Sequence, residues 1–192
     1  MSSLFSHLRV SSEYSITQGL LTIDQIVEKA SEKSIPSVAL TDKSNMFGLV
    51  KFFNKCESAG IKPISGASIS MVFETDESPF ELLCLAKTNN GHKNLMKVIS
   101  NAHNNSLYNS PIIDFKELVE LKDDIVVISG GKNSHIFEYI KRDKITDALN
   151  VVDQFRNHFK DDFVIEIQRT NRADEIENFK NILPISIEKG IP

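Results

Sequence analysis

Short apolar segments alternate with amphipathic segments along almost the whole chain, and this alternation restricts the fold more than any other feature. The apolar segments, such as Val38-Ala39-Leu40 and Ile125–Ile128, span about four to six residues. Strands this short and apolar are buried on both faces, which is typical of a parallel sheet covered by helices. We therefore predict a mainly parallel α/β sheet with right-handed helical crossovers. Six or seven such units curl into a barrel more readily than they stay flat.

The prediction is one (β/α) barrel-like domain over residues 1–192, truncated near its last strand. Glu188-Lys189-Gly190 has the pattern of a helix end, and Ile191-Pro192 that of a new strand. We therefore expect the 192 residues to be an N-terminal fragment of a longer chain.

The first helix is the most clearly marked element. Thr22 and Gln25 stand three residues apart, which is the spacing of a capping box. The apolar residues that follow recur at helical spacing and form one face: Ile23, Ile26, Val27 and Ala30. We also expect Asn90 to cap a later helix, and Pro184 to interrupt the last helix, which begins near residue 174.

Alternating apolar and polar residues predict further strands. Residues 4–10 are expected as a first strand, and residues 163–167 as a late one. Residues 68–73 and 80–86 are predicted to pair across the acidic loop at 74–77.

Charge and cysteine content exclude several classes of protein. The net charge is −4, so no overall basic field is present for tight, unaided binding of DNA. Cys56 and Cys84 lack CxxC spacing, and we expect them to pack as small hydrophobes in the reducing cytoplasm. No apolar run approaches the ~20 residues that span a bilayer, so no membrane partner is expected.

In a parallel barrel, functional side chains stand where strands end and loops begin. One histidine and two carboxylates there fall short of a two- or three-metal hydrolase centre, which needs more such ligands. Arg9 and Lys43 place positive charge where a metal ion would sit. We therefore assign no catalytic, cofactor-binding or metal-binding residue. The residues expected at these positions are His7, Arg9, Gln18, Asp42, Lys43, Ser68, Glu81 and Ser129-Gly130-Gly131.

Two of these features have a structural interpretation that we favour. His7 and Asp42 fit a hydrogen-bonded pair or a capping role better than a ligand role. Gly130-Gly131-Lys132 follows a strand and has backbone N–H groups that suit an anion, but an ordinary strand-to-helix turn accounts for it better.

Three longer segments, at residues 7–15, 39–48 and 60–66, resemble a known family. They are similar to the PHP (polymerase and histidinol phosphatase) domain, in particular the one that opens the alpha subunit of bacterial DNA polymerase III. The resemblance covers essentially all 192 residues, and it is specific in combination rather than in any single motif. Later segments agree with it: residues 85–95, 128–131, 166–170 and 190–192.

The resemblance implies a distorted seven-stranded (β/α) barrel. Metal-binding members of the family hold up to three metal ions and hydrolyse phosphoesters, and some polymerase versions act as 3′→5′ exonucleases. This chain departs from their ligand set at most positions that can be compared. The family's first ligands form a His-x-His motif, of which this chain keeps His7 and has Arg9 in the second place. At the other ligand positions, the residue of this chain differs from the one that the family has. Those positions are Gln18 in place of Asp, Lys43 in place of the His that follows Asp42, Ser68 in place of Glu, Glu81 in place of His, and Gly131 in place of Cys.

These losses imply the branch of the family whose PHP domain is inactive and holds no cofactor, because ligand number and charge set metal affinity. In that branch the proofreading exonuclease subunit, epsilon, docks on the PHP domain. The other implied partner is the rest of the polymerase alpha chain, which alone contacts DNA and holds Mg²⁺ in a palm domain outside these residues. The alternative is an active metal-dependent phosphoesterase or 3′→5′ exonuclease that uses His7, Asp42 and Glu81 with residues beyond Pro192.

The two cations suggest how a former metal pocket is stabilised. A pocket that loses its metal ions keeps negative charge, which a basic side chain can offset. We therefore expect Arg9 and Lys43 to pair with Asp42 or Glu81. On this hypothesis, Lys43→Ala lowers the free energy of unfolding by roughly 1–3 kcal/mol.

Overall fold

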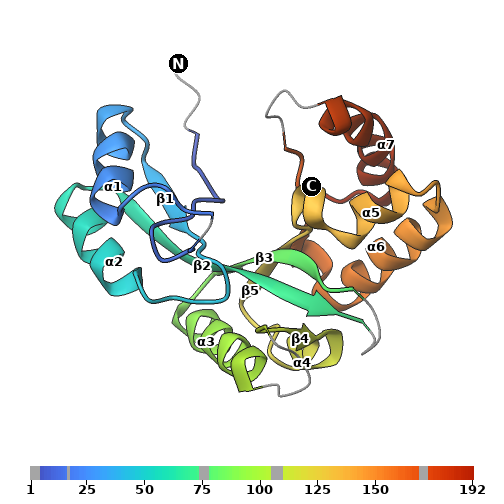
Figure 1. Cartoon of the computed structure of the whole chain (residues 1–192), viewed down its shortest axis with the longest axis horizontal. Coiled ribbons are helices and arrows are strands. Elements are labelled where there is room, and N and C mark those ends of the chain that lie inside the picture. The colour runs from blue at the N-terminus through green and yellow to red at the C-terminus, as the bar shows by residue number, and fades with distance from the viewer. Residues whose placement is uncertain (1–4, 17, 74–77, 105–109, 169–172) are drawn as a thin grey trace.

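Six strands form one mixed sheet in the part of the chain that the structure describes (Figure 1). The computed structural model describes residues 5–16, 18–73, 78–104, 110–168 and 173–192. The strand order is β1-β2-β3-β5-β6, and β4 pairs with β2. The strands are β1 (Ser37–Leu40), β2 (Lys62–Val72), β3 (Phe80–Ala86), β4 (Ile113–Asp114), β5 (Ile125–Ile128) and β6 (Phe163–Val164).

The centre of the sheet is antiparallel, so the sheet is mixed, and the predicted parallel pairing holds for three of the five strand pairs of the described sheet. β3 runs antiparallel to β2, with Ser70 opposite Glu81, and antiparallel to β5, with Leu83 opposite Ile128. The parallel pairs are β1 with β2, β2 with β4, and β5 with β6. β3 follows β2 with no intervening helical crossover, which a parallel neighbour requires. The expected pairing of residues 68–73 with 80–86 is confirmed, and its loop at 74–77 lies outside the described residues.

A closed barrel of seven strands is not confirmed. β1 and β6 end the strand order of the described sheet and do not pair with each other. Beside β1, the predicted strand at residues 4–10 is reduced to one bridge, between His7 and Val38. Beside β6, the N–H of Ile165 donates to the carbonyl of Pro192 at 2.9 Å.

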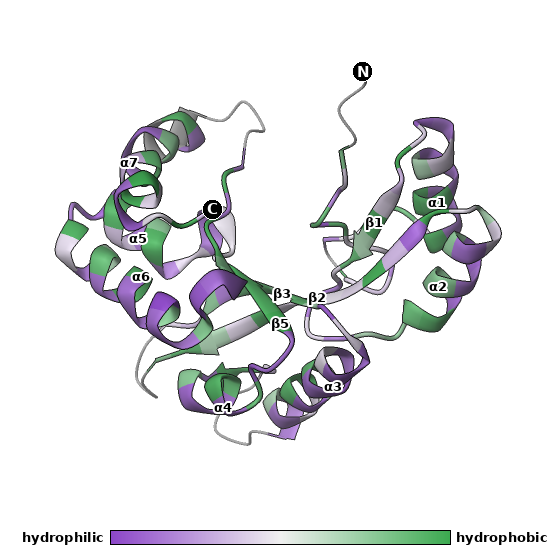
Figure 2. Ribbon diagram, turned by 180° about the vertical axis from the view of Figure 1, so that it is seen from behind, coloured by the Kyte–Doolittle hydropathy of each residue, from purple (hydrophilic) through white to green (hydrophobic). Residues whose placement is uncertain are grey.

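The helices cover one face of the curved sheet, which we call the outer face; the opposite face is the inner face (Figures 1 and 2). α1 and α2 lie beside β1 and β2, α3 and α4 lie below the centre, and α5, α6 and α7 lie beyond β5 (Figure 1). The helices are α1 (Ile23–Glu32), α2 (Leu49–Ser58), α3 (Asn89–Asn104), α4 (Phe115–Glu120), α5 (His135–Lys141), α6 (Ile145–Phe159) and α7 (Ala173–Lys189).

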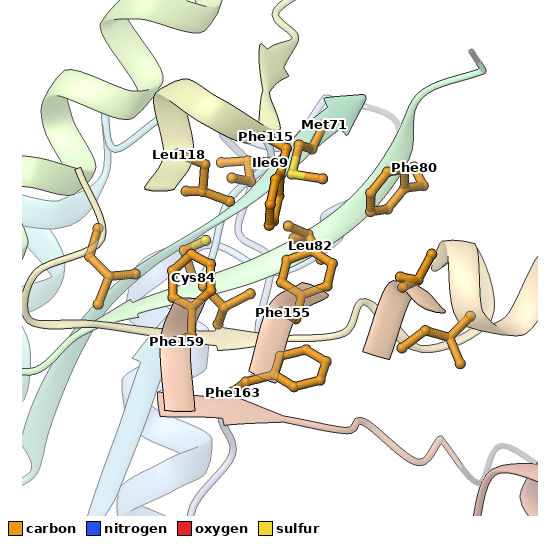
Figure 3. Close-up of a cluster of buried hydrophobic side chains, with 14 of the residues drawn as sticks. Ile69, Met71, Phe80, Leu82, Cys84, Phe115, Leu118, Phe155, Phe159 and Phe163 are labelled. Atoms are coloured by element: carbon orange, nitrogen blue, oxygen red, sulfur yellow. The ribbon is translucent and has the colours of Figure 1, made fainter. Parts of the chain in front are cut away.

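The largest cluster of buried apolar side chains joins the outer face to its helices. Figure 3 shows Leu82 and Cys84 of β3 in this cluster with Phe155 of α6. Alternate residues of a strand point to opposite faces, so Glu81 and Leu83 lie on the inner face. Leu83 packs there in a smaller apolar cluster with Ala39, Leu85 and Ile128. The large core therefore determines which face receives Glu81.

Both cysteines are free and buried, which confirms that they pack as small hydrophobes. Burial raises the pKa of the Cys84 thiol to about 12 and that of Cys56 to about 11. Within the described residues, no helix combines the length and apolar character needed to cross a membrane.

The capping box of α1 is confirmed. The Thr22 hydroxyl accepts from the N–H of Gln25 at 3.3 Å, and the Gln25 side chain accepts from the N–H of Thr22 at 2.9 Å. The expected cap at Asn90 is wrong by two residues, because α3 begins at Asn89. The Thr88 hydroxyl accepts from the N–H groups of Asn90 and Gly91 instead.

The expected interruption at Pro184 is also wrong, since α7 continues through it. A proline removes one helical N–H donor, and the residues on both sides remain helical here.

We expect Thr22→Ala to lower the free energy of unfolding by about 1 kcal/mol, because the N–H of Gln25 loses its acceptor. Urea denaturation would measure the change. The matched control is Ser31→Ala, an exposed serine in the same helix whose hydroxyl has no hydrogen bond within the described residues. Equal stability of Thr22→Ala and the wild type would contradict the assigned role of the cap.

Candidate functional site

The residues at the start of the described chain bring Arg9 to the sheet. The N–H of Ala39 donates to the carbonyl of His7 at 2.9 Å, and the N–H of Thr41 donates to that of Val10 at 2.8 Å. Thr41 also accepts, through its side-chain oxygen, from the N–H of Val10 at 2.9 Å. These bonds hold the segment around Arg9 in register with β1.

Two carboxylates from distant parts of the sequence meet Arg9. Glu81 projects from the inner face of β3 and is 8% exposed. Glu166 follows β6, and its backbone N–H donates to the Ser129 hydroxyl at 3.0 Å. Thus the central strand and one edge of the sheet each contribute a carboxylate, while the opposite edge contributes the cation.

Arg9 binds both carboxylates. Its Nε and one terminal nitrogen each donate to an oxygen of Glu166 at 2.7 Å, which is a bidentate pair. The other terminal nitrogen donates to Glu81. Two amides complete the cluster: Gln168 donates to Glu166 at 3.0 Å and Asn133 donates to Glu81 at 3.4 Å. We call these five residues the Arg9 cluster. Its planar, bidentate geometry is one that a guanidinium satisfies and an ammonium does not.

The electrostatic balance at Arg9 favours the ion pair. Burial of the side chain by itself lowers the pKa of Arg9, but hydrogen bonds to Glu166 and Glu81 and the charge of these two carboxylates raise it above its ordinary value. Arg9 therefore remains a cation and holds the two carboxylates at a place where they would otherwise repel each other.

Asp42 is separate from this cluster. It is 1% exposed, and it accepts from the N–H and the hydroxyl of Ser12, both at 2.7 Å, and from the Ser15 hydroxyl at 2.6 Å. This arrangement agrees with a structural role for Asp42, with serines as partners. His7 is exposed and stacks edge-on against Phe5 at 4.9 Å, so it does not pair with Asp42.

The expected pairing of Lys43 with Asp42 or Glu81 is wrong. The Lys43 side chain is exposed and forms no ion pair within the described residues. The oxygens of Asp42 are bound by serines, and Arg9 binds Glu81, so neither carboxylate needs a second cation.

The remaining residues that we predicted at the ends of strands are not members of the Arg9 cluster. Gln18 is exposed. Ser68 is 3% exposed on β2, and its hydroxyl has no hydrogen-bond partner among the described residues. Gly131 has φ +58°, and a Cβ there would lie 2.5 Å from the Gln168 side chain, so a larger residue would displace a member of the cluster.

This donor set does not fit the metal centre that the fold family implies. Within the described ranges, no three His, Cys, Asp or Glu side chains are grouped so as to hold a metal ion. The guanidinium of Arg9 lies between Glu81 and Glu166, and a divalent cation at the same place would face its positive charge. We therefore derive no reaction step through a metal.

Sequence reasoning missed Glu166, Asn133 and Gln168. Glu166 lies in a segment that carries the family resemblance, but the spacing of the sequence contains no signal that Arg9 binds it across 157 residues. Asn133 ends a short 3-10 helix and Gln168 lies in the irregular segment after β6, and only the folded structure shows which carboxylates these two amides bind.

A model of the PHP domain family matches residues 7–170, a range that includes every member of the Arg9 cluster. The chain belongs to the PHP family. Its sequence is 34% identical over 190 residues to the DNA polymerase III subunit alpha of Vibrio cholerae, and equally identical over 190 residues to that of Escherichia coli K12. Each alignment covers 98% of this chain and 16% of the relative, so the chain spans about one sixth of the length of these relatives.

A solved structure shares the PHP fold. The crystal structure of a Bifidobacterium adolescentis protein described as a metal-dependent phosphoesterase superposes with a TM-score of 0.61. The superposition covers 97% of this chain and 84% of that protein at 14% sequence identity. At this identity the similarity concerns the fold alone.

We expect Arg9→Leu to lower the free energy of unfolding by about 3 kcal/mol, because it leaves two partly buried carboxylates without a cation. Denaturant unfolding would measure the loss, and adding Glu81→Gln and Glu166→Gln should recover most of it. Lys43→Ala is the matched control and should change stability by less than about 0.5 kcal/mol. Equal losses for Arg9→Leu and Lys43→Ala would refute the assignment.

Proposed function

We propose that this chain is the N-terminal PHP domain of a DNA polymerase III alpha subunit, and that the domain is non-catalytic. It stabilises the polymerase and provides a docking site for the proofreading exonuclease subunit, epsilon. The parent chain would perform template-directed DNA synthesis with Mg²⁺ in a palm domain outside these residues, and would contact DNA there. The observation that carries the proposal is Arg9, a cation placed between the carboxylates of Glu81 and Glu166.

Charge and ligand number support the proposed non-catalytic role. A hydrolytic metal centre needs several free anionic or neutral donors and open coordination positions. Here Glu81 and Glu166 bond a guanidinium, Asp42 bonds serines, and His7 lies against Phe5. Because Arg9 donates hydrogen bonds to Glu81 and Glu166, it can stabilise the domain without a metal ion.

The polymerase context is supported by the relatives. The alignment runs almost the full length of this chain, at one third identity, to several DNA polymerase III alpha subunits. A relative from Borreliella burgdorferi, 32% identical over 199 residues, carries the same description and is matched over 17% of its length. A PHP domain within a much longer polymerase is therefore the arrangement that we propose here.

The second candidate is an active metal-dependent phosphoesterase or 3′→5′ exonuclease, and the likeness of the fold to a phosphoesterase is its support. The metal content of the domain distinguishes an active phosphoesterase from the proposed non-catalytic domain. We expect the full-length alpha chain with its palm carboxylates removed to bind no stoichiometric Zn²⁺ or Mn²⁺ in this domain, measured by elemental analysis after dialysis.

The positive control restores the ligand types that the family resemblance implies, through Arg9→His, Gln18→Asp, Lys43→His and Ser68→Glu. A gain of bound metal in this variant shows that the assay detects a PHP centre. Stoichiometric metal on the unmodified domain, with phosphodiester hydrolysis that a chelator abolishes, would establish the active enzyme instead.

The docking role has its own test. We expect the full-length alpha chain to bind purified epsilon with a dissociation constant in the micromolar range or below, measured by calorimetry. An alpha chain that lacks residues 1–192, and that still extends primers, serves as the control and should not bind. Equal binding by both chains would remove the docking role from this domain.

A further inference from the structure

Two cavities lie between α3 and the segment that leads into and begins α2, and both are separate from the Arg9 cluster. The first, about 740 Å³, is lined by the start of α2, the start of β2, the end of β3 and the start of α3. The second, about 510 Å³, is lined by residues 44–47 and by the second half of α3. In Figure 1, α2 and α3 lie on neighbouring parts of the helical layer. We call the two cavities together the α2–α3 groove.

One side of α3 contributes lining residues to both cavities. Apart from the adjacent Ile99 and Ser100, the lining positions from His92 to His103 are separated by three, four, seven, eight or eleven residues, which places them on one side of a helix. Eleven residues correspond to about 16 Å, or three helical turns. His92 lines the first cavity, and Met96, Ile99, Ser100 and His103 line the second.

Large apolar side chains lie exposed along the groove. Phe47 and Val50 are each 76% exposed, and Met96 on the opposite wall is 49% exposed. Their neighbour Phe52 lies instead in the core between α1 and α2. Exposed apolar side chains that gather around a cavity mark a surface for another polypeptide.

The charge of the groove differs from that of the chain. Among the described residues, no Asp or Glu lines either cavity, whereas Lys62, Lys87 and two histidines do. Lys87 bonds Asp162 at 2.7 Å, but Lys62 has no carboxylate partner in the described part of the chain. The net charge of the chain is −4, so the groove is a local reversal of sign. Complementarity therefore favours a partner with carboxylates beside its apolar residues.

We propose that the α2–α3 groove binds an acidic, amphipathic segment of a separate protein, with apolar anchors at helical spacing. Phe47, Val50 and Met96 contact the anchors, and Lys62 pairs with a flanking carboxylate. An apolar groove about three turns long is a common receptor for such a helix. The inference rests on the proposed function, because it places the docking of the exonuclease subunit in this groove.

The test uses the full-length alpha chain and purified epsilon in calorimetry. Phe47→Ser and Met96→Lys should each weaken binding at least about tenfold, as central apolar contacts do. Ile187→Ser is the matched control, since Ile187 is 72% exposed and lies outside the groove. Lys62→Glu should weaken binding, and the exposed Lys33→Glu should not. Melting curves confirm that each variant is folded.

The outcomes separate the groove from the docking function. If wild-type alpha binds epsilon and the groove variants bind equally well, the groove is overturned while the docking function stands. If the wild type does not bind, the docking function fails, and the inference that rests on it fails too.

The accessibility of position 96 shows whether the rest of the alpha chain or a second copy of it already covers the groove. Met96→Cys in the free full-length chain should react rapidly with a bulky maleimide, followed by peptide mass spectrometry, and epsilon should slow the reaction. Slow labelling of the free chain means that the groove is already covered. Light scattering then tells whether the rest of a monomer or a second copy covers it, and either result overturns the proposal.

Discussion

The ion pairs of Arg9 connect three parts of the fold that lie far apart in the sequence. Arg9 belongs to the segment beside β1, Glu81 to the central strand, and Glu166 to the segment after β6. Between the two edges the sheet is open, and the guanidinium spans it through hydrogen bonds to two carboxylates. Because the pairs are partly buried, removal of one partner costs far more than a surface salt bridge contributes. The ion pairs at the polar end of the inner face thus depend on the Arg9 side chain.

The outer-face core makes this arrangement possible. β3 buries Phe80, Leu82 and Cys84 against the helices, so its intervening residues must face inward. A register slip of one residue would move Glu81 into the apolar core and bring Leu82 to Arg9. The position of the Arg9 cluster is therefore determined by packing on the opposite side of the sheet, where the largest buried side chains lie.

A PHP fold can keep its site while changing what stabilises it. Metal ions and a guanidinium both offset carboxylate charge, but a guanidinium has fixed, planar hydrogen bonds and no open coordination position. The Arg9 cluster can stabilise the domain through such hydrogen bonds. Such a change is consistent with a domain that acts through its surface, and we propose that the α2–α3 groove is the part of that surface that binds a partner.

Local signals in the sequence were sufficient for several features. The capping box of Thr22 and Gln25, the hairpin of β2 and β3, and the buried strand at Ile125–Ile128 depend on neighbouring residues, and each formed as predicted. The sequence also singled out Arg9 and Glu81 as unusual residues for a metal pocket. It assigned Lys43 the same role as Arg9, although only the guanidinium reaches the carboxylates.

The order of the strands in the sheet and the ion-pair partners were decided by tertiary structure alone. The alternation of strands and helices by itself predicted a parallel sheet, but β3 lacks a crossover helix and turns back beside β2. Arg9 and Glu166 are 157 residues apart, and no local pattern relates them; the folded sheet brings them to 2.7 Å. Short-range hydrogen bonding and periodicity can be read from the residues themselves, whereas contacts across the sheet exist only after the core has fixed each strand's register.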